Sequence, residues 1–262
     1  MMKHFLVFCC LAPALVAAQE YHLAPPKIMA DSIFFLQHST VRLAFALEGA
    51  AVYFTTDGSL PVLNSPVYNA PLSLSASSTV TAVSRHPEYI AGKPAAVQLI
   101  KAGFLPDSIR LLAQPDTQYA GSGEKALSDL QKGGSDLHDG RWLGFRGDTV
   151  EAEFVFSKPV SCRQIIVSTL SNPGSWIFPP RRIDIYGETT SGTWQHLGNW
   201  KSNQQYNWKQ QSADYALYKE IEIKQIPARR FKLKVISFGY LPADHPGAGA
   251  PAWLFLDEVI FQ

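Results

Sequence analysis

Residues 239–262 read GYLPADHPGAGAPAWLFLDEVIFQ, and this stretch decides how the rest of the chain must fold. Its first half holds three prolines and three glycines, which break helical turns and strand ladders and therefore predict a shaped loop. Its second half, Ala252 to Phe261, is an apolar run that must be buried, which predicts a closing strand laid into a sheet. A loop that carries His245 and leads into such a strand is where a β-sandwich would display a binding site.

The composition is typical of an extracellular all-β protein. The chain has 262 residues, enough for one large or two small domains, and 12% of them are aromatic while only 17% are charged. The 23 Lys and Arg residues nearly balance the 22 Asp and Glu residues. Because no excess of positive charge is available to attract phosphate groups, we expect neither nucleic acid nor an anionic membrane surface as a partner.

The first 18 residues have the pattern of a secretory signal peptide. Lys3 and His4 form a basic start, residues 5–16 an apolar core, and residues 16–18 a small-residue cleavage site before Gln19. A membrane anchor is the alternative, but the apolar run is too short to span a bilayer comfortably. We therefore expect a secreted, periplasmic or cell-surface protein with no membrane segment left after cleavage.

The three cysteines offer no internal disulfide to the exported protein. Cys9 and Cys10 lie in the signal, without the small residue just before the cysteine that a lipoprotein signal needs. Cys162 remains alone in a strand-like run and is expected to be a buried small hydrophobe. The fold must therefore be held together by its hydrophobic cores.

Two all-β segments follow a leader at residues 19–26. In the first, residues 27–101, short strands alternate with turns, as in a small β-sandwich; the expected strands are 41–47, 51–56, 78–84 and 95–100. A Gly- and Pro-containing boundary around a weak strand at 108–113 opens the second, residues 105–262, whose spacing fits a sandwich or jelly roll. Its expected strands are 149–156, 163–169, 182–186, 194–197, 218–223, 230–236 and 253–261.

The first segment resembles a known module. VYFTTDGSLP at 52–61, SPVY at 65–68 and STVTA at 78–82 are similar to the chitobiase/β-hexosaminidase C-terminal domain, also called the fibronectin-III-associated module. This resemblance implies an Ig- or fibronectin-like sandwich. The Asp57-Gly58 turn could contact sugar, but a structural spacer is favoured because nothing concave or aromatic-rich is apparent in this part of the sequence.

The second segment resembles the discoidin, or coagulation factor 5/8 type C, domain. The residues that carry the resemblance are KALSD at 125–129, DGRWLGF at 139–145, SWIFPP at 175–180, HPGAG at 245–249 and AWLFLDE at 252–258. They are most similar to the branch appended to secreted bacterial β-hexosaminidases, where it follows the chitobiase-like module. The chain has no room for the hexosaminidase catalytic barrel, so a separate glycoside hydrolase is a possible partner.

Glycan recognition needs flat apolar faces for the C–H side of a sugar and planar hydrogen-bonding groups for its hydroxyls. The loops of the second segment supply both; the candidate ligand-binding residues are Trp142, Phe145, Arg146, Phe178, Arg181, Tyr206, Trp208, Tyr240 and His245. The alternative is that these rings plug the ends of the sandwich, which is favoured for Trp176 and Trp253. Asp244 stands where the family resemblance leads us to expect an aromatic ring, so a stacking ring has been lost there or a different ligand is bound.

The discoidin resemblance also implies a structural calcium ion. Asp129 and Glu258 match the positions of an early loop and a terminal strand that hold such an ion, and calcium prefers hard oxygen ligands. Leu130 follows Asp129 where the family commonly has glycine, which weakens the match. The alternative is a solvated Asp129 and a Glu258 in a surface ion pair.

An enzyme is not favoured by these residues. Asp257 and Glu258 are neighbours on a strand and would point to opposite faces, so they could not flank one glycosidic bond. The seven histidines show no metal-binding His-x-x-x-His spacing, and His245 has no obvious nucleophile partner. No glycine-rich phosphate loop follows a strand and opens a helix.

The sequence therefore predicts a secreted, non-catalytic all-β protein, built from a small Ig- or fibronectin-like sandwich followed by a discoidin-like jelly roll. We expect it to bind glycan weakly through the loop aromatics of the second domain. The alternative is a structural or adhesion module that contacts proteins or the cell envelope, or an accessory fragment of a β-hexosaminidase system. An exposed cluster of Trp142, Phe178, Tyr206 and His245 would favour glycan binding, and burial of all four would favour the alternative.

Overall fold

The computed structural model describes residues 21–202 and 206–262. The predicted signal peptide, with Cys9 and Cys10, lies outside these residues. Within them every helical segment is a short 3-10 helix: η1 (Thr117–Tyr119), η2 (Gly123–Leu127), η3 (Pro173–Ser175) and η4 (Trp208–Gln210). In the part of the chain that is described, no helix has the length and apolarity needed to cross a membrane. The predicted all-β fold class is confirmed.

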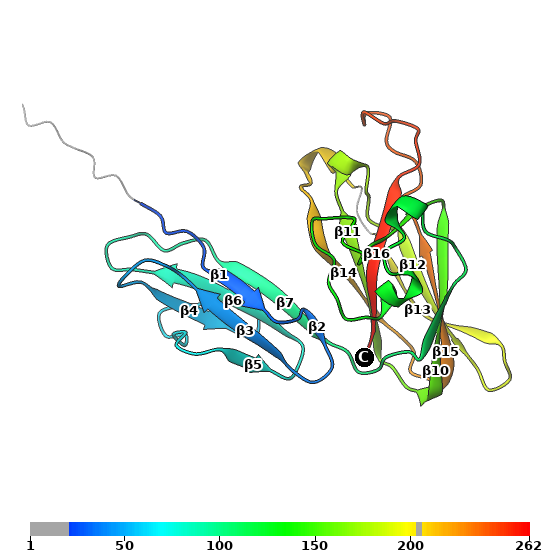
Figure 1. Cartoon of the computed structure of the whole chain (residues 1–262), viewed down its shortest axis with the longest axis horizontal. Helices are drawn as coiled ribbons and strands as arrows, with labels where there is room; N and C mark the ends of the chain where they lie inside the picture. The colour runs from blue at the N-terminus through cyan, green and yellow to red at the C-terminus, as the bar shows by residue number, and fades with distance from the viewer. Residues whose placement is uncertain (1–20, 203–205) are drawn as a thin grey trace, which may run out of the picture.

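Strands β1 to β7 form two sheets, which we call the first domain (Figure 1). One sheet has the order β1-β3-β5, from β1 (Lys27–Ala30), β3 (Ser39–Ala44) and β5 (Leu72–Leu74). The other has the order β2-β7-β6-β4, from β2 (Phe34–Phe35), β7 (Ala95–Lys101), β6 (Ser78–Arg85) and β4 (Ala51–Thr55). Val41, Val80 and Leu99 are fully buried between them, as the alternation of apolar residues along the strands requires.

Strands β8 to β16 form a larger sandwich, the second domain. Its five-stranded sheet has the order β13-β12-β15-β10-β8, from β13 (Trp194–Lys201), β12 (Arg182–Glu188), β15 (Ala228–Ile236), β10 (Thr149–Val160) and β8 (Ser108–Leu111). Its four-stranded sheet has the order β14-β11-β16-β9, from β14 (Asp214–Glu222), β11 (Gln164–Ser171), β16 (Trp253–Phe261) and β9 (Leu143–Arg146). Phe154, Phe231 and Phe261 meet edge-to-face in the core between the sheets.

The predicted closing strand is confirmed as β16. It lies between β11 and β9, and all of its residues except Trp253 are buried. Cys162 packs in the same core with no exposed surface, and burial raises the pKa of its thiol to about 12, so it is a small hydrophobe as expected.

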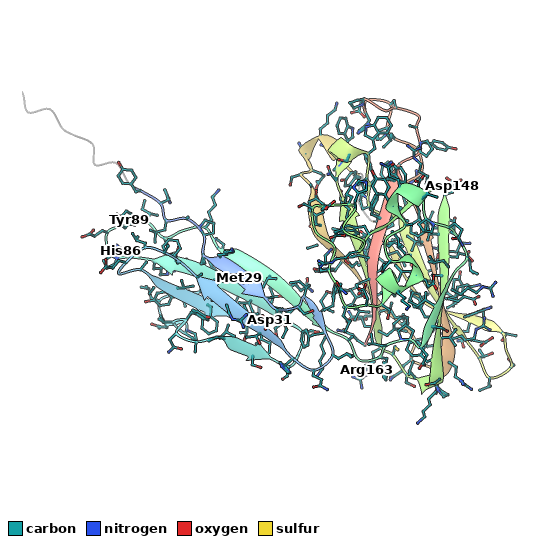
Figure 2. All side chains as sticks on the ribbon, in the orientation of Figure 1. Met29, Asp31, His86, Tyr89, Asp148 and Arg163 are labelled. Atoms are coloured by element: carbon teal, nitrogen blue, oxygen red, sulfur yellow. The ribbon has the colours of Figure 1, made fainter. Side chains whose placement is uncertain are left out.

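The two ends of the second domain differ in what they carry. The linker from the first domain arrives at one end, where the Gly103 and Phe104 amides donate to the carbonyl of Phe261. We call the opposite end the loop end; it is formed by residues 147–148, 172–181, 206–213 and 237–252. In Figure 2, Asp148 marks the loop end and Arg163 the end that faces the first domain. Any site on the loop end therefore points away from the first domain.

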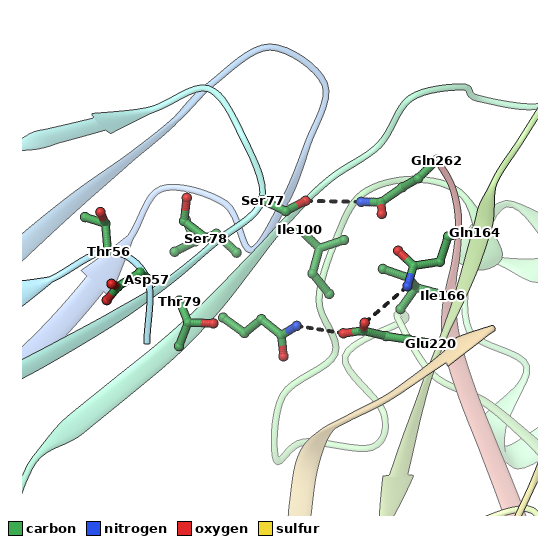
Figure 3. Close-up of a pocket in the computed structure, with 12 residues that line it drawn as sticks. Thr56, Asp57, Ser77, Ser78, Thr79, Ile100, Gln164, Ile166, Glu220 and Gln262 are labelled. Atoms are coloured by element: carbon green, nitrogen blue, oxygen red, sulfur yellow. Dashed lines mark hydrogen bonds between the residues drawn. The ribbon is translucent and has the colours of Figure 1, made fainter. Parts of the chain in front are cut away.

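An apolar cluster joins the two domains. Phe34 and Ile100 of the first domain pack against Ile166 and Ile260 of the second, and all four side chains are at least 97% buried. Around this cluster the side-chain amide of Gln98 donates to Glu220 Oε1 at 3.1 Å, and that of Gln262 donates to Ser77 Oγ at 3.1 Å. A shallow hollow of about 300 Å³ lies over these hydrogen bonds (Figure 3). A contact that combines buried apolar side chains with hydrogen bonds favours a fixed arrangement of the domains.

Candidate functional site

The loop end gathers most of the predicted ligand-binding residues. Four connections meet there because strands β9, β11, β13 and β15 end on that side and their successors begin on it. The predicted residues found at this end are Arg146, Phe178, Arg181, Tyr206, Trp208, Tyr240 and His245. Their side chains, however, differ widely in exposure.

Trp142 and Phe145 are in the core, so their prediction as ligand contacts is wrong. Trp142 has no exposed surface; its indole N–H donates to the carbonyl of Gly134 at 2.9 Å, and Lys132 Nζ lies 4.2 Å from the ring centroid. Phe145 lies on β9 and is only 2% exposed. Phe145 belongs to β9, which pairs with β16, and packs in the core between the two sheets, while Trp142 lies just before β9 and packs against Phe255.

Phe178 and His245 are also buried, at 0% and 5% exposure, and cannot contact a ligand directly. The Phe178 ring packs against Tyr206 at 5.3 Å and His245 at 5.6 Å between centroids. His245 accepts a hydrogen bond from the amide of Gly247 at Nδ1, and Nε2 donates to the carbonyl of Pro173 at 3.1 Å. These two side chains therefore hold three loops together instead of forming the binding surface.

Trp208 is fixed on the surface by Asp244. Its indole N–H donates to Asp244 Oδ1 at 3.1 Å, and its ring meets the buried His245 ring edge-on at 4.5 Å. Lys209 Nζ pairs with the other oxygen of Asp244 at 2.8 Å, and the Lys209 and Trp208 hydrogen bonds lower the pKa of the Asp244 carboxyl. The carboxylate that replaces an expected aromatic residue thus positions a different aromatic ring, delivered from another loop.

Tyr206 stands between two hollows of the loop end. Its hydroxyl forms a 2.6 Å hydrogen bond with Ser171 Oγ, and partial burial raises the pKa of the phenol. One hollow, of about 590 Å³, is lined by Trp200, Tyr206, Asn207, Gln210, Gln211 and Asp214 among others. The other, of about 650 Å³, is lined by Tyr206, Asn207, Trp208, Phe238, Pro242 and Asp244. Aromatic faces thus lie beside amide and carboxylate groups, which is the combination that sugars require.

Besides the four buried residues Trp142, Phe145, Phe178 and His245, three predicted residues line neither hollow. Arg146 lies over the Trp253 ring at 4.4 Å, and Arg181 lies over the Phe238 ring at 5.3 Å. Tyr240 is 62% exposed at the last loop. Conversely, the sequence did not single out Trp200 and Asn207. Trp200 is the residue before the end of β13 and Asn207 lies in a polar run, so the two come together only where β13 meets the next loop in the folded chain.

Asp129 and Glu258 are brought together at the start of the second domain. The amide of Gln131 donates to Asp129 Oδ1 at 2.9 Å and to Glu258 Oε1 at 3.1 Å. Glu258 has no exposed surface, so the expected surface ion pair is wrong. Burial raises its pKa to about 10, and the hydrogen bond and charge of Asp129 act in the same direction.

The fit of this carboxylate pair to a calcium ion can be judged from its oxygens. Glu258 Oε2 is buried and has no hydrogen-bond partner among the described residues, which is the signature of a group lacking its counterpart. No cluster of three or more Asp, Glu, His or Cys side chains with metal-binding geometry occurs in residues 21–202 and 206–262. The two carboxylates are oxygen ligands of the kind that calcium prefers, and backbone carbonyls and water would have to complete its shell.

Asp257 and Glu258 both face residues 129–133, so the prediction that they point to opposite faces is wrong. In the pairing of β16 with β11, Glu258 is opposite Ser168 and Leu256 is opposite Thr169, which leaves Asp257 in a β-bulge. Asp257 Oδ2 accepts from Lys132 Nζ and from the amide of Gly133, each at 2.8 Å. Neither carboxylate has any exposed surface, so neither can reach a glycosidic bond.

Comparison with known proteins gives one match to a protein-family model. The chitobiase/β-hexosaminidase C-terminal domain matches residues 34–94, within the first domain. A search of curated proteins finds no match.

Several solved structures are similar to part of this chain. The family 32 carbohydrate-binding module of Streptococcus pneumoniae EndoD is 13% identical, with 60% of this chain and 97% of that chain covered and a TM-score of 0.38. The C-terminal domain of a chitobiase from Bacteroides fragilis is 17% identical, with 61% and 95% covered and a TM-score of 0.38. A SusE-like protein is 12% identical, with 90% and 95% covered and a TM-score of 0.36.

Proposed function

We propose that this protein is a non-catalytic carbohydrate-binding protein whose site is the surface around Tyr206 at the loop end. The observation that carries this proposal is the placement of Tyr206 and Trp208, two partly exposed rings, beside hollows lined by Asn207, Gln210 and Asp214. The apolar face of a sugar ring would stack on an aromatic ring, and its hydroxyls would exchange hydrogen bonds with the amides and the carboxylate. Because both hollows are open to solvent, binding would be weak.

A glycan array tests this function directly. We expect the full mature chain to bind at least one glycan, and Tyr206→Ala to lose that signal. Tyr240→Ala is the matched control, since Tyr240 is an exposed tyrosine of the same end that lines neither hollow. An array on which the wild-type chain binds nothing would refute the proposal.

A structural or adhesion role is the second candidate. It is favoured by the burial of Trp142, Phe178 and His245, which leaves Tyr206 as the only partly exposed member of the four rings chosen to discriminate the two roles. A chain that binds a cell-envelope protein but no glycan would establish this role instead.

We place the protein outside the cytoplasm, exported by residues 1–18, where a glycoside hydrolase could share its glycan. Asp129 and Glu258 would hold a calcium ion that ties the loop after Asp129 to strand β16. The ion would supply only charge to that loop. The site at Tyr206 lies on other loops and needs no metal.

A further inference from the structure

The first domain has a hollow of its own, which the proposed function does not use. It measures about 390 Å³ and lies beside the turn 86–89 that follows β6. His86 and Tyr89 mark it in Figure 2, at the tip of the first domain that points away from the second domain. The volume is within the range of about 300–1,000 Å³ that is common for small-molecule sites.

Aromatic and apolar side chains form the walls of this hollow. They are contributed by Tyr53 of β4, by Leu63, and by His86 and Tyr89. The rings of His86 and Tyr89 meet edge-on with their centroids 5.0 Å apart, and Tyr89 remains 37% exposed. Leu63 is 71% exposed and adds an apolar surface to the wall of the hollow. These surfaces suit the C–H face of a sugar ring.

Arg85 brings an unsatisfied cation into the same hollow. Its guanidinium carbon lies 5.8 Å from the centroid of the Tyr53 ring, and one terminal nitrogen donates to the carbonyl of Pro61 at 3.2 Å. Its Nε is buried and has no hydrogen-bond partner in the described part of the chain. The ion pairs found between described residues do not include Arg85.

The Arg85 side chain is partly exposed and donates one hydrogen bond to the described protein, from one terminal nitrogen to the carbonyl of Pro61, so its other terminal nitrogen is left for a ligand. The planar guanidinium matches a carboxylate, which accepts charge-assisted N–H bonds from its terminal nitrogens. The expected ligand group is therefore a carboxylate.

An acidic peptide is less well suited than a sugar. A peptide would bind most readily by adding a strand to β4, which is the edge strand of its sheet. That edge is already covered: the amide of Phe54 donates to the carbonyl of Pro66, and the amide of Tyr68 donates to that of Val52. The hollow accepts a compact ring better than an extended chain.

We propose that this hollow binds a sugar residue that carries a carboxylate. Arg85 pairs with the carboxylate, while Tyr53 and Tyr89 contact the sugar ring. The site is separate from the loop end and stands whether or not the surface around Tyr206 binds glycan.

The test uses the full mature chain and two probes that differ only in the carboxylate, methyl β-D-glucuronide and methyl β-D-glucoside. In an NMR titration we expect the glucuronide to shift the signals of His86 and Tyr89, and the glucoside to bind at least tenfold more weakly. Arg85→Gln should weaken the glucuronide at least tenfold, Arg85→Lys should recover part of the affinity, and Tyr206→Ala should change nothing.

Three results would overturn the proposal. They are equal binding of the two probes, a glucuronide affinity in Arg85→Gln within twofold of wild type, and a penta-glutamate peptide that binds these residues more tightly than the glucuronide. If Arg85→Gln proves unfolded by circular dichroism, Tyr89→Ala at the exposed rim replaces it, and it must weaken the glucuronide for the proposal to stand.

Discussion

At the scale of single residues, the chain separates aromatic side chains that build the site from those that form its surface. Phe178 and His245 are chemically suited to sugar binding, yet both hold loops together from beneath. The sequence could identify these residue types and place them on loops, but it could not give their exposure. That depends on contacts such as Trp208 with Asp244, which are 36 residues apart and belong to different loops.

The hydrogen bond between Trp208 and Asp244 can be tested by removing the carboxylate. Asp244→Ala frees the indole ring and leaves Lys209 without its partner, so we expect glycan affinity to fall about three- to tenfold through lost preorganisation. Stability should hardly change, because Asp244 is exposed. The measurement is calorimetric titration with a glycan found on the array. Unchanged affinity would show that Trp208 does not need this anchor.

Glu258 makes stability depend on pH. In the calcium-free folded protein its pKa is raised to about 10 from an ordinary value of 4.5, so the unfolded chain loses this proton at a lower pH than the folded protein. The free energy of unfolding contributed by this group is therefore full below pH 4.5 and falls as the pH rises toward 10. With a chelator present, we expect a lower melting temperature at pH 8.5 than at pH 5.5, and Glu258→Gln should weaken this trend.

The wild type and Glu258→Gln can also be compared in the presence of calcium. The ion favours the ionised carboxylate, so it should raise the melting temperature of the wild type at pH 8.5 and leave that of Glu258→Gln unchanged. An equal response of both proteins to calcium would contradict the assignment of Asp129 and Glu258 as its ligands.

At the scale of elements, period-two patterns locate most strands, and the failures have physical causes. The closing strand was predictable from its apolar run, and β10 and β15 from alternation. Strand β9 was not, because it has four residues, includes Gly144 and follows a turn, so it has the pattern of a loop. The bulge at Asp257 could not be predicted from the sequence either, because its position is set by the pairing of β16 with β11.

The assignment of Trp142 to the core, beside β9, predicts a large effect on stability. Trp142→Ala removes a fully buried ring and its hydrogen bond to Gly134, so we expect the free energy of unfolding to fall by about 3–5 kcal/mol in urea. A variant that is as stable as the wild type but binds glycan less well would contradict the core assignment and show that Trp142 belongs to the binding surface.

At the scale of the whole molecule, the first domain fixes the direction in which the loop end points. Four buried apolar side chains join the domains at the end opposite the loops, together with side-chain hydrogen bonds that include Gln98 to Glu220 and Gln262 to Ser77. The sequence placed two all-β segments in order, but it could not reveal this contact, because its residues come from positions 34, 100, 166 and 260.

The domain contact can be tested by truncating Phe34. Phe34→Ala should cost about 3–5 kcal/mol at the contact and let the domains reorient, which small-angle scattering would show as a larger radius of gyration. Leu36→Ala is the matched control, since Leu36 is a nearby leucine that is 42% exposed. Identical scattering from all three proteins would mean that the linker alone sets the arrangement.

The central claim is that the surface around Tyr206 binds glycan, and the most direct measurement is the affinity ratio of two tyrosine variants for the best glycan on the array. Because truncation of an aromatic anchor commonly costs more than 1 kcal/mol, we predict that Tyr206→Ala binds about tenfold more weakly than wild type or worse. Tyr240→Ala should bind within twofold of wild type. Equal affinity of Tyr206→Ala and wild type would contradict the account.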